Sequence, residues 1–215
     1  WETALPSSLK LAYLPNPGAV RLRLSAYEVE GESVSKEIER QFEALRKIIP
    51  HNIIGYETAT MQELVHKLLT ERGLTLATAE SCTGGSIAAR FTAMPGASAY
   101  FLCGVVSYSN ASKHDLLGVA PEVIARHGAV SEEVARRMAE GARRISGADC
   151  AIATTGIAGP AGGSAEKPVG TVWIAVATSH RTTAILKQCG SDRGQIIDRA
   201  SAFAISLLRD ELNGK

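Results

Sequence analysis

The stretch LTLATAESCTGGSIAARF, residues 74–91, decides the fold of this chain. Its beginning, Leu74–Ala79, is rich in β-branched and small residues and predicts a strand, whereas Ser86–Phe91 has a helical pattern. Small residues form a tight connection between them. A strand, a small-residue turn and a helix start in direct succession bring hydroxyls and free backbone N–H groups to the carboxyl edge of a sheet, where open α/β folds bind ligands.

From this stretch to the C-terminus, segments rich in β-branched and small residues alternate with helical patterns. We expect strands over Leu74–Ala79, Gly104–Ser109, Cys150–Thr155, Thr171–Thr178 and Thr182–Cys189. The clearest helix is Glu132–Ile145, because Ser131 can cap it, acidic residues occupy its first turn and Gly147 follows it. The alternation predicts an α/β fold, a layered α/β/α domain over residues 59–215.

The first 58 residues predict a separate small α+β unit. Leu9–Leu14 and Val20–Ser25 are expected to form a hairpin around the turn Pro15–Gly18. A helix with apolar residues at helical spacing follows over Val34–Ile49, and Ile53–Ile54 suggests a third short strand. Such a hairpin-helix-strand unit is near the lower size limit for independent stability, so we expect it to lean on a neighbour.

Charge and hydropathy exclude several classes of protein. The chain of 215 residues carries 23 basic and 22 acidic side chains, a net charge of +1, which does not favour binding to nucleic acid or to an anionic membrane. It has neither an apolar run long enough to span a bilayer nor a secretory leader pattern, and we expect a cytoplasmic protein. The chain begins at Trp1 rather than at a methionine, which indicates processing or a segment of a longer protein.

The spacing of cysteines and histidines predicts chemistry without a metal or another cofactor. The four cysteines are scattered without a CxxC pair, so neither structural zinc nor a disulfide framework is expected. The five histidines form no HExxH or other paired spacing that would predict a transition-metal site.

Three segments combine residues that can carry chemistry. Thr78–Gly85 offers a nucleophile beside an oxyanion or phosphate nest, or else only a tight turn with an N-cap. Ser107–Lys113 follows a strand, and a desolvated lysine or a tyrosine from it could take a proton from Ser81. The alternative for Lys113 is a solvated side chain at a helix start capped by Asn110.

The third segment, Thr154–Ser164, releases four glycines within eight residues after a strand. Its amides can approach a ligand closely, although it is neither a Walker A motif nor a GxGxxG motif, and a flexible connection is the alternative. Farther on, Arg193 precedes the last helix and is either a phosphate ligand or a surface charge.

Six motifs in order, AESCTGG, YSNASK, HGAVSEE, TTGIAGPAGG, EKPVGTVW and SDR, resemble the C-terminal domain of CinA proteins. The resemblance runs from about Met61 to Leu212. It implies hydrolysis of the carboxamide of nicotinamide mononucleotide to nicotinic acid mononucleotide and ammonia, a step in pyridine nucleotide recycling. Residues 1–58 resemble the KH-like connector of full-length CinA proteins, so we expect a molybdopterin-binding-like domain to precede this chain in the whole protein.

The resemblance also implies roles for individual residues. Ser81 would be the nucleophile, Lys113 and Tyr108 would handle its proton, and Thr155 would position the substrate or the oxyanion. The residues implied in substrate binding are Glu80, Thr83, Gly84, Gly85, Ser98, Gly156, Gly159, Gly162 and Arg193. Within this set, Glu80 would steer the lysine, Ser98 would relay a proton, and Thr83, Gly84 and Gly85 would supply amides to an anion. Cys82 remains an alternative nucleophile, because a thiolate needs less activation.

Two other functions stay open. The chain could be a catalytically silent interaction or scaffold module, for which the exposed pair Arg21 and Arg23 is the direct support. It could also be a nucleotide phosphohydrolase, although clustered carboxylates for magnesium are absent from the sequence. The partners we expect are the mononucleotide substrate and a second copy of the chain in a homodimer, and neither a membrane nor nucleic acid.

Overall fold

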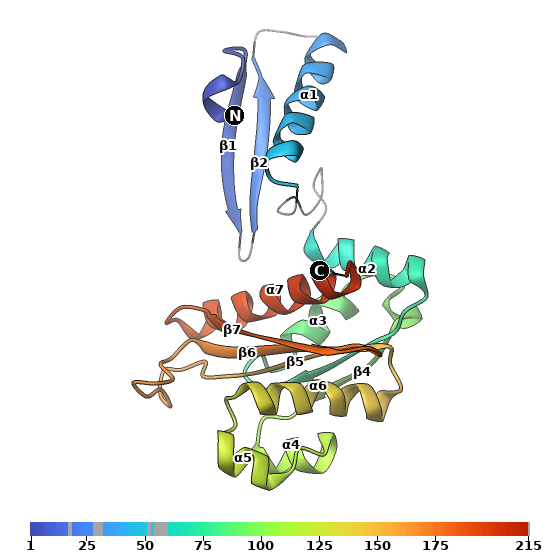
Figure 1. Cartoon of the computed structure of the whole chain (residues 1–215), viewed down its shortest axis with the longest axis vertical. Coiled ribbons are helices and arrows are strands. Elements are labelled where there is room, and N and C mark those ends of the chain that lie inside the picture. The colour runs from blue at the N-terminus through green and yellow to red at the C-terminus, as the bar shows by residue number, and fades with distance from the viewer. Residues whose placement is uncertain (17–18, 28–31, 51–52, 54–59, 215) are drawn as a thin grey trace. The chain divides into compact units, whose positions relative to one another are not determined.

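The computed structural model describes residues 1–16, 19–27, 32–50, 53 and 60–214 of the chain (Figure 1). Contacts divide the chain into two compact units, Trp1–Thr58 and Ala59–Lys215, and each is described by itself.

The first unit is a hairpin with a helix. Its elements are η1 (Glu2–Ala4), β1 (Leu9–Asn16), β2 (Ala19–Ala26) and α1 (Glu32–Ile48), and the two strands are antiparallel. Leu9 and Leu45 are buried in its small core, and the indole Nε1 of Trp1 donates to the carbonyl of Gln41 at 3.0 Å. Ile53 lies in no strand, and Ile54, like the expected turn residues Pro17 and Gly18, lies outside the described residues.

The second unit is built on a five-stranded mixed sheet. Its strands are β3 (Leu76–Glu80), β4 (Phe101–Val106), β5 (Cys150–Gly156), β6 (Thr171–Ala177) and β7 (Thr182–Gln188), in the order β4-β3-β5-β6-β7. β3 pairs in parallel with β4 and β5, whereas β5, β6 and β7 pair antiparallel. The reversal at β6 returns β7 to the direction of β5. The carboxyl ends of β3, β4, β5 and β7 therefore share one edge of the sheet.

Helices cover both faces of this sheet. They are α2 (Met61–Arg72), α3 (Ser86–Thr92), α4 (Asn110–Leu117), α5 (Pro121–His127), α6 (Glu132–Ser146) and α7 (Arg193–Leu212), with the short η2 (Ala97–Ala99) before β4. In Figure 1, α2, α3 and α7 lie on one face, α6 lies on the other, and α4 and α5 lie beyond α6. The predicted layered α/β/α fold is confirmed. Within the described residues, no helix has the length and apolarity needed to cross a bilayer.

Two elements differ from the sequence-based expectation. A strand was expected over Gly104–Ser109, but β4 begins and ends three residues earlier. The reason is that Ser109 is the N-cap of α4: its hydroxyl accepts from the backbone N–H of Ser112, and the Ser112 hydroxyl accepts from that of Ser109. The helix α5, which begins with Pro121 at its first position, was not expected at all.

Two apolar cores of different composition hold the layers together. The core towards α2, α3 and α7 contains large residues such as Leu69, Phe91 and Ile205. The core towards α6 is rich in alanine, and its alanines from the strands and from the helix are Ala77, Ala79, Ala151, Ala153, Ala175, Ala177, Ala135, Ala139 and Ala142. Small side chains on both sides let α6 lie close to the sheet.

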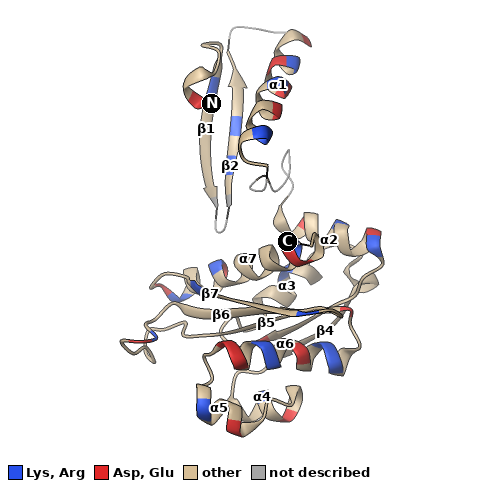
Figure 2. Ribbon diagram, viewed as in Figure 1, with Lys and Arg blue, Asp and Glu red and all other residues tan. Residues whose placement is uncertain are grey.

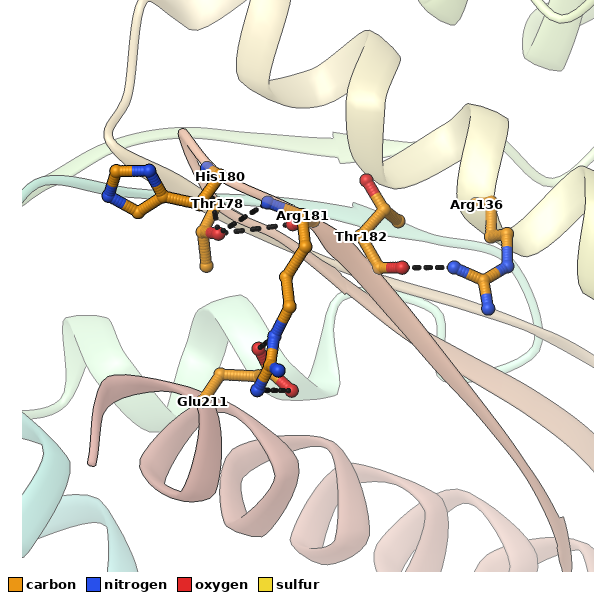
Figure 3. A network of polar contacts seen from close by, with 6 residues as sticks. All are labelled: Arg136, Thr178, His180, Arg181, Thr182 and Glu211. Atoms are coloured by element: carbon orange, nitrogen blue, oxygen red, sulfur yellow. Dashed lines mark hydrogen bonds and ion pairs between the residues drawn. The ribbon is translucent and has the colours of Figure 1, made fainter. Parts of the chain in front are cut away.

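Polar contacts tie the sheet's far edge to the helices. Arg181, just before β7, donates Nε and Nη2 to the Glu211 carboxylate of α7 at 2.8 and 3.2 Å, and Arg136 of α6 donates to the carbonyl of Thr182 (Figure 3). Acidic and basic residues alternate along α6 (Figure 2), where Glu132 and Arg136 pair at 2.7 Å. These contacts fix the edge strand between two layers.

Gly141 of α6 packs closely against the backbone at the end of α4. A Cβ there would lie 2.1 Å from the carbonyl oxygen of Leu117, at the end of α4. We expect Gly141→Ala to destabilise the protein by about 1–3 kcal/mol, because overpacking against backbone forces α4 and α6 apart. Thermal unfolding measures it. The control is Gly194→Ala in α7, where the nearest atom is 3.4 Å away and a helix-favouring residue is tolerated; an equal loss in both variants would contradict the prediction.

Candidate active site

The side chains of Ser81 and Lys113 meet at the carboxyl edge of the sheet. Lys113 Nζ lies 3.0 Å from Ser81 Oγ and donates to the carbonyl of Ser107 at 2.9 Å. Ser81 directly follows β3, and Ser107 directly follows β4. The serine and lysine are separated by 32 residues in the sequence. The geometry is that of a serine hydroxyl beside an amine that can take its proton.

Local structure around each of the two residues sets this geometry. The N–H of Ser81 donates to the carbonyl of Thr154 on β5 at 3.0 Å, and the N–H of Ser107 donates to the carbonyl of Glu80 at 2.8 Å. The capped start of α4 then carries Lys113 back over the sheet edge. Lys113 is only 2% exposed, so the solvated lysine that was the alternative is wrong.

Burial changes the proton affinity of two neighbouring groups. Desolvation lowers the pKa of Lys113 from its ordinary value, because the charged ammonium loses water. Desolvation also raises the pKa of Cys82 to about 12, so its thiol is protonated near neutral pH. The amine is therefore shifted towards the form that accepts a proton, whereas the thiol is shifted away from the form that attacks.

A cavity of about 290 Å³ opens in front of this pair. Its lining includes Ser81, Cys82, Tyr108, Asn110, Lys113, Ala129, Val130, Thr155, Gly156, Gly159, Gly162 and Arg193. The structure thus brings together eight of the residues expected at the site, from segments that lie far apart in the sequence. The titratable residues of this lining include two basic ones, Lys113 and Arg193, and no carboxylate.

One wall of the cavity is the connection between α5 and α6. Thr155 Oγ1 donates to the carbonyl of Ala129 at 2.7 Å, and Lys167 Nζ donates to the carbonyls of His127 and Val130 at 3.2 and 2.8 Å. The strand end of β5 and the glycine-rich loop are therefore both fastened to this wall. Because the Thr155 hydroxyl donates its proton to the Ala129 carbonyl, it can still accept a hydrogen bond through its oxygen.

Tyr108 and Arg193 lie at the mouth of the cavity. Arg193 donates Nη2 to the hydroxyl of Tyr108 at 2.9 Å and Nη1 to the carbonyl of Gly159 at 2.8 Å. Tyr108 is 59% exposed, and the hydrogen bonds of the described residues connect its hydroxyl to Arg193, not to Lys113 or Ser81. The geometry gives Tyr108 a place on the rim rather than beside the amine.

The acidic residue before Ser81 has a different role from the expected one. Glu80 is fully buried, and its carboxylate accepts from the hydroxyl of Thr83 at 2.7 Å and from the backbone N–H groups of Gly85, Ile87 and Ala88 at 3.0, 3.0 and 2.8 Å. None of these bonds reaches Lys113. The expectation that Glu80 steers the lysine is corrected by this geometry: the carboxylate is occupied by the start of α3.

The backbone amides of Gly84 and Gly85, which were expected to bind an anion, already donate hydrogen bonds within the protein. The N–H of Gly84 donates to the carbonyl of Ser81 at 3.1 Å, and the N–H of Gly85 donates to Glu80. Gly84 and Gly85 adopt φ values of +60° and +99°, which glycine tolerates and which let the turn double back. These two amides and the Thr83 hydroxyl thus serve the turn itself instead of the cavity.

Ser98 lies away from the site. It is exposed in η2, before β4, whereas Ser81 follows the carboxyl end of the neighbouring parallel strand β3. The two serines are therefore at opposite edges of the sheet, and a direct proton relay between them is not supported.

Two residues in or beside the cavity were given no role in the site from the sequence. Asn110 is the first residue of α4, not its cap, and lines the cavity one helical turn before Lys113. Lys167 fastens the glycine-rich loop to the α5–α6 connection. Asn110 lies inside a segment that was already named as a candidate from the sequence. The role of Lys167 depends on backbone carbonyls, which every residue type carries, so the sequence gives no indication of it.

The second unit matches a known family. The model of the CinA C-terminal domain matches residues 58–212. The chain belongs to the CinA family. A CinA-like protein of Flavobacterium psychrophilum is 44% identical over 213 residues, which are 99% of this chain and 51% of that protein, and one of Amoebophilus asiaticus is 40% identical over 215 residues, 100% and 52%. The chain spans about half the length of the curated relatives it matches.

Solved CinA-family structures have the same fold. The competence damage-inducible protein A of Klebsiella pneumoniae superposes with a TM-score of 0.69 at 37% identity and covers 71% of this chain and 95% of that chain. The competence/damage inducible protein CihA of Agrobacterium tumefaciens has a TM-score of 0.68 at 40% identity over 74% of this chain and 99% of that chain. The resemblance to the family is thus confirmed by sequence and by structure.

The buried amine predicts a pH-dependent stability. Because the pKa of Lys113 is lowered on folding, the unfolded chain binds more protons between that lowered value and the ordinary 10.5, and this residue's contribution to stability rises with pH across the window. We expect Lys113→Met to gain more melting temperature relative to wild type near pH 7 than near pH 10. Ser81→Ala, which keeps the amine, should track the wild type across this range. A pH-independent difference for Lys113→Met would contradict the prediction.

Proposed function

We propose that this chain hydrolyses the carboxamide of nicotinamide mononucleotide to nicotinic acid mononucleotide and ammonia. The observation that carries the proposal is the buried amine of Lys113, 3.0 Å from the hydroxyl of Ser81 in a cavity. Perturbed lysines in clefts are concentrated at functional sites. Membership in the CinA family gives the proposal its substrate.

The proposed reaction uses the two residues in turn. Neutral Lys113 takes the proton of Ser81 as Oγ attacks the carboxamide carbon, and a tetrahedral oxyanion forms. The oxyanion collapses to a serine ester as the lysine gives the proton to the leaving nitrogen, and ammonia departs. A water molecule then attacks the ester, its proton passes through Lys113 to Ser81 Oγ, and the carboxylic acid is released. Serine with lysine is a known variant of serine-based acyl transfer.

The oxyanion needs donors close to Ser81. Among the backbone amides of the described turn, those of Ser81, Gly84 and Gly85 are bonded within the fold, whereas Cys82, the next residue after the nucleophile, follows it into the cavity lining. An amide directly after the nucleophile is a common oxyanion donor. We therefore assign the Cys82 N–H to the oxyanion, with the substrate held against Thr155.

The charge of the cavity supports an anionic substrate. Its described lining combines the basic residues Lys113 and Arg193 with no carboxylate or histidine. With Lys113 neutral in its role as base, Arg193 is the residue left to pair with the phosphate, and the glycine-rich loop from Gly156 to Gly162 brings backbone close to it. The nucleotide phosphohydrolase has less support, because the described residues contain no group of His, Cys, Asp and Glu side chains that could hold a metal ion.

The silent module also has less support than the enzyme. Burying an amine is costly unless it is bonded, and a scaffold gains nothing from directing it at a serine hydroxyl. The preceding molybdopterin-binding-like domain and the KH-like nature of residues 1–58 remain predictions of the resemblance. The homodimer and the cytoplasmic location also remain predictions.

The nucleophile is testable by a pair of neighbouring substitutions. Ser81→Ala should lower kcat for ammonia release from nicotinamide mononucleotide by roughly a thousandfold or more, since the attacking atom is lost. Cys82→Ala is the matched control and should keep most of the activity, because its thiol is protonated near neutral pH. Purified proteins with no added metal are assayed for ammonia, and circular dichroism verifies the fold. Comparable losses in the two variants would leave Ser81 without its assigned role.

Arg193 is expected to recognise the phosphate. A hydrogen bond to a charged group contributes about 1.5–3 kcal/mol, so Arg193→Ala should lower kcat/KM for the mononucleotide roughly ten- to a hundredfold. The nicotinamide riboside, which has no phosphate, should be a poor substrate whose kcat/KM hardly changes in this variant. Arg199→Ala, on the same helix but outside the cavity lining, is the control. Equal rates of wild-type protein on riboside and mononucleotide would refute the assignment.

A further inference from the structure

The buried carboxylate of Glu80 has no part in the reaction proposed above, yet it directly precedes the nucleophile. Its two oxygens accept four hydrogen bonds, three from backbone N–H groups at the start of α3 and one from Thr83 Oγ1. A buried carboxylate is stable when donors compensate its lost water, and the N-terminus of a helix adds favourable charge. The carboxylate therefore clamps residues 81–85 between the end of β3 and the helix.

Thr83 extends this clamp to the next strand. Its Oγ1 lies 2.7 Å from a Glu80 carboxylate oxygen and 2.7 Å from Thr154 Oγ1 on β5, and the three side chains are almost completely buried. Since the Thr83 proton goes to the carboxylate, its oxygen accepts from Thr154. A chain of hydrogen bonds thus runs from β5 through the turn to the carboxylate.

The same residues hold the backbone of the nucleophile and of its base. Ser81 N–H donates to the Thr154 carbonyl, and the Glu80 carbonyl accepts from Ser107, whose own carbonyl receives the Lys113 amine. Both ends of the Ser81–Lys113 contact are therefore anchored on Glu80 and Thr154. A rotation of this turn would move the serine hydroxyl and the amine relative to each other.

We propose that Glu80, Thr83 and Thr154 form a positioning network that keeps Ser81 Oγ within hydrogen-bond distance of Lys113. The inference rests on the proposed role of Ser81 as nucleophile. Glu80 acts through the turn and neither takes nor gives a proton in the reaction. A misplacement of about 1 Å at a reacting group costs about a hundredfold in rate, so loosening the turn should reduce turnover rather than substrate binding.

The test compares Thr83→Val with Thr83→Ser. Valine keeps the branched shape and removes the hydroxyl that joins Glu80 to Thr154, whereas serine keeps the hydroxyl. Thr92→Val is the matched control on α3, because the Thr92 hydroxyl is exposed and donates only within the helix. Each protein is reacted with a fluorophosphonate probe, which counts reactive Ser81 sites and gives a labelling rate, and kcat and KM for the mononucleotide are then expressed per labelled site.

We expect Thr83→Val to lower both kcat and the labelling rate per site about tenfold or more, with KM changed less than twofold. The midpoint of the pH–rate profile should stay in place, because the burial that lowers the pKa of Lys113 is kept. Thr83→Ser should recover most of both rates, and Thr92→Val should match the wild type. A role in folding alone would lower the number of labelled sites and the melting temperature but not the rates per site.

Unchanged rates per site in Thr83→Val, or equal losses in Thr83→Val and Thr92→Val, would overturn the positioning role. Glu80→Gln is a second test, because the side-chain amide of glutamine cannot accept all four hydrogen bonds. Its rates per labelled site should fall at least as far as those of Thr83→Val. Wild-type rates in Glu80→Gln would overturn the proposal. The two proposals fail differently. Wild-type protein that is labelled at Ser81 but releases no ammonia would refute the substrate while the labelling rates still test the network, whereas an unlabelled Ser81 would overturn both.

Discussion

A lysine amine held out of water against a serine hydroxyl is the constraint on which the rest of this domain depends. Lys113 is almost fully buried, and its amine has two partners, Ser81 Oγ and the carbonyl of Ser107. The carbonyl can only accept, so it takes one N–H and orients the amine. Desolvation lowers the pKa of Lys113, which shifts the amine towards the neutral form whose lone pair can accept the serine proton. Without both partners, the buried amine would be a net loss to stability.

The mixed sheet satisfies this constraint by bringing several strand ends to one edge. β3 lies between β4 and β5, so the serine after β3 is flanked by the anchor of the lysine after β4 and by Thr155 at the end of β5. The antiparallel return through β6 and β7 then brings Arg193, at the start of α7, to the same edge. The cavity thus combines the proposed nucleophile, its proposed base and Arg193, and the connections between α5 and α6 and between β5 and β6 complete its lining.

How far the sequence alone leads differs between elements. Runs of β-branched residues predicted β5, β6 and β7 to within a residue or two, and capping residues predicted α6. The end of β4 was missed because Ser109 fits both a strand and an N-cap, and the reciprocal Ser109–Ser112 bonds decide between them. The motifs likewise identified Ser81, Lys113 and Thr155 as candidates, but local sequence alone favoured a solvated lysine at position 113.

By itself, the sequence determined the α/β class, the order of the five sheet strands along the chain, the family and the small set of side chains able to do acyl-transfer chemistry. All of these follow from periodicity, capping and motif content, which act over short stretches of chain. Only the tertiary structure decided three contacts. Lys113 lies within hydrogen-bond distance of Ser81, Tyr108 accepts a hydrogen bond from Arg193, and the Glu80 carboxylate accepts from backbone N–H groups at the start of α3. The physical reason is that burial and side-chain hydrogen bonding depend on the register of neighbouring strands and on helix packing, which join residues 32, 71 and 85 positions apart.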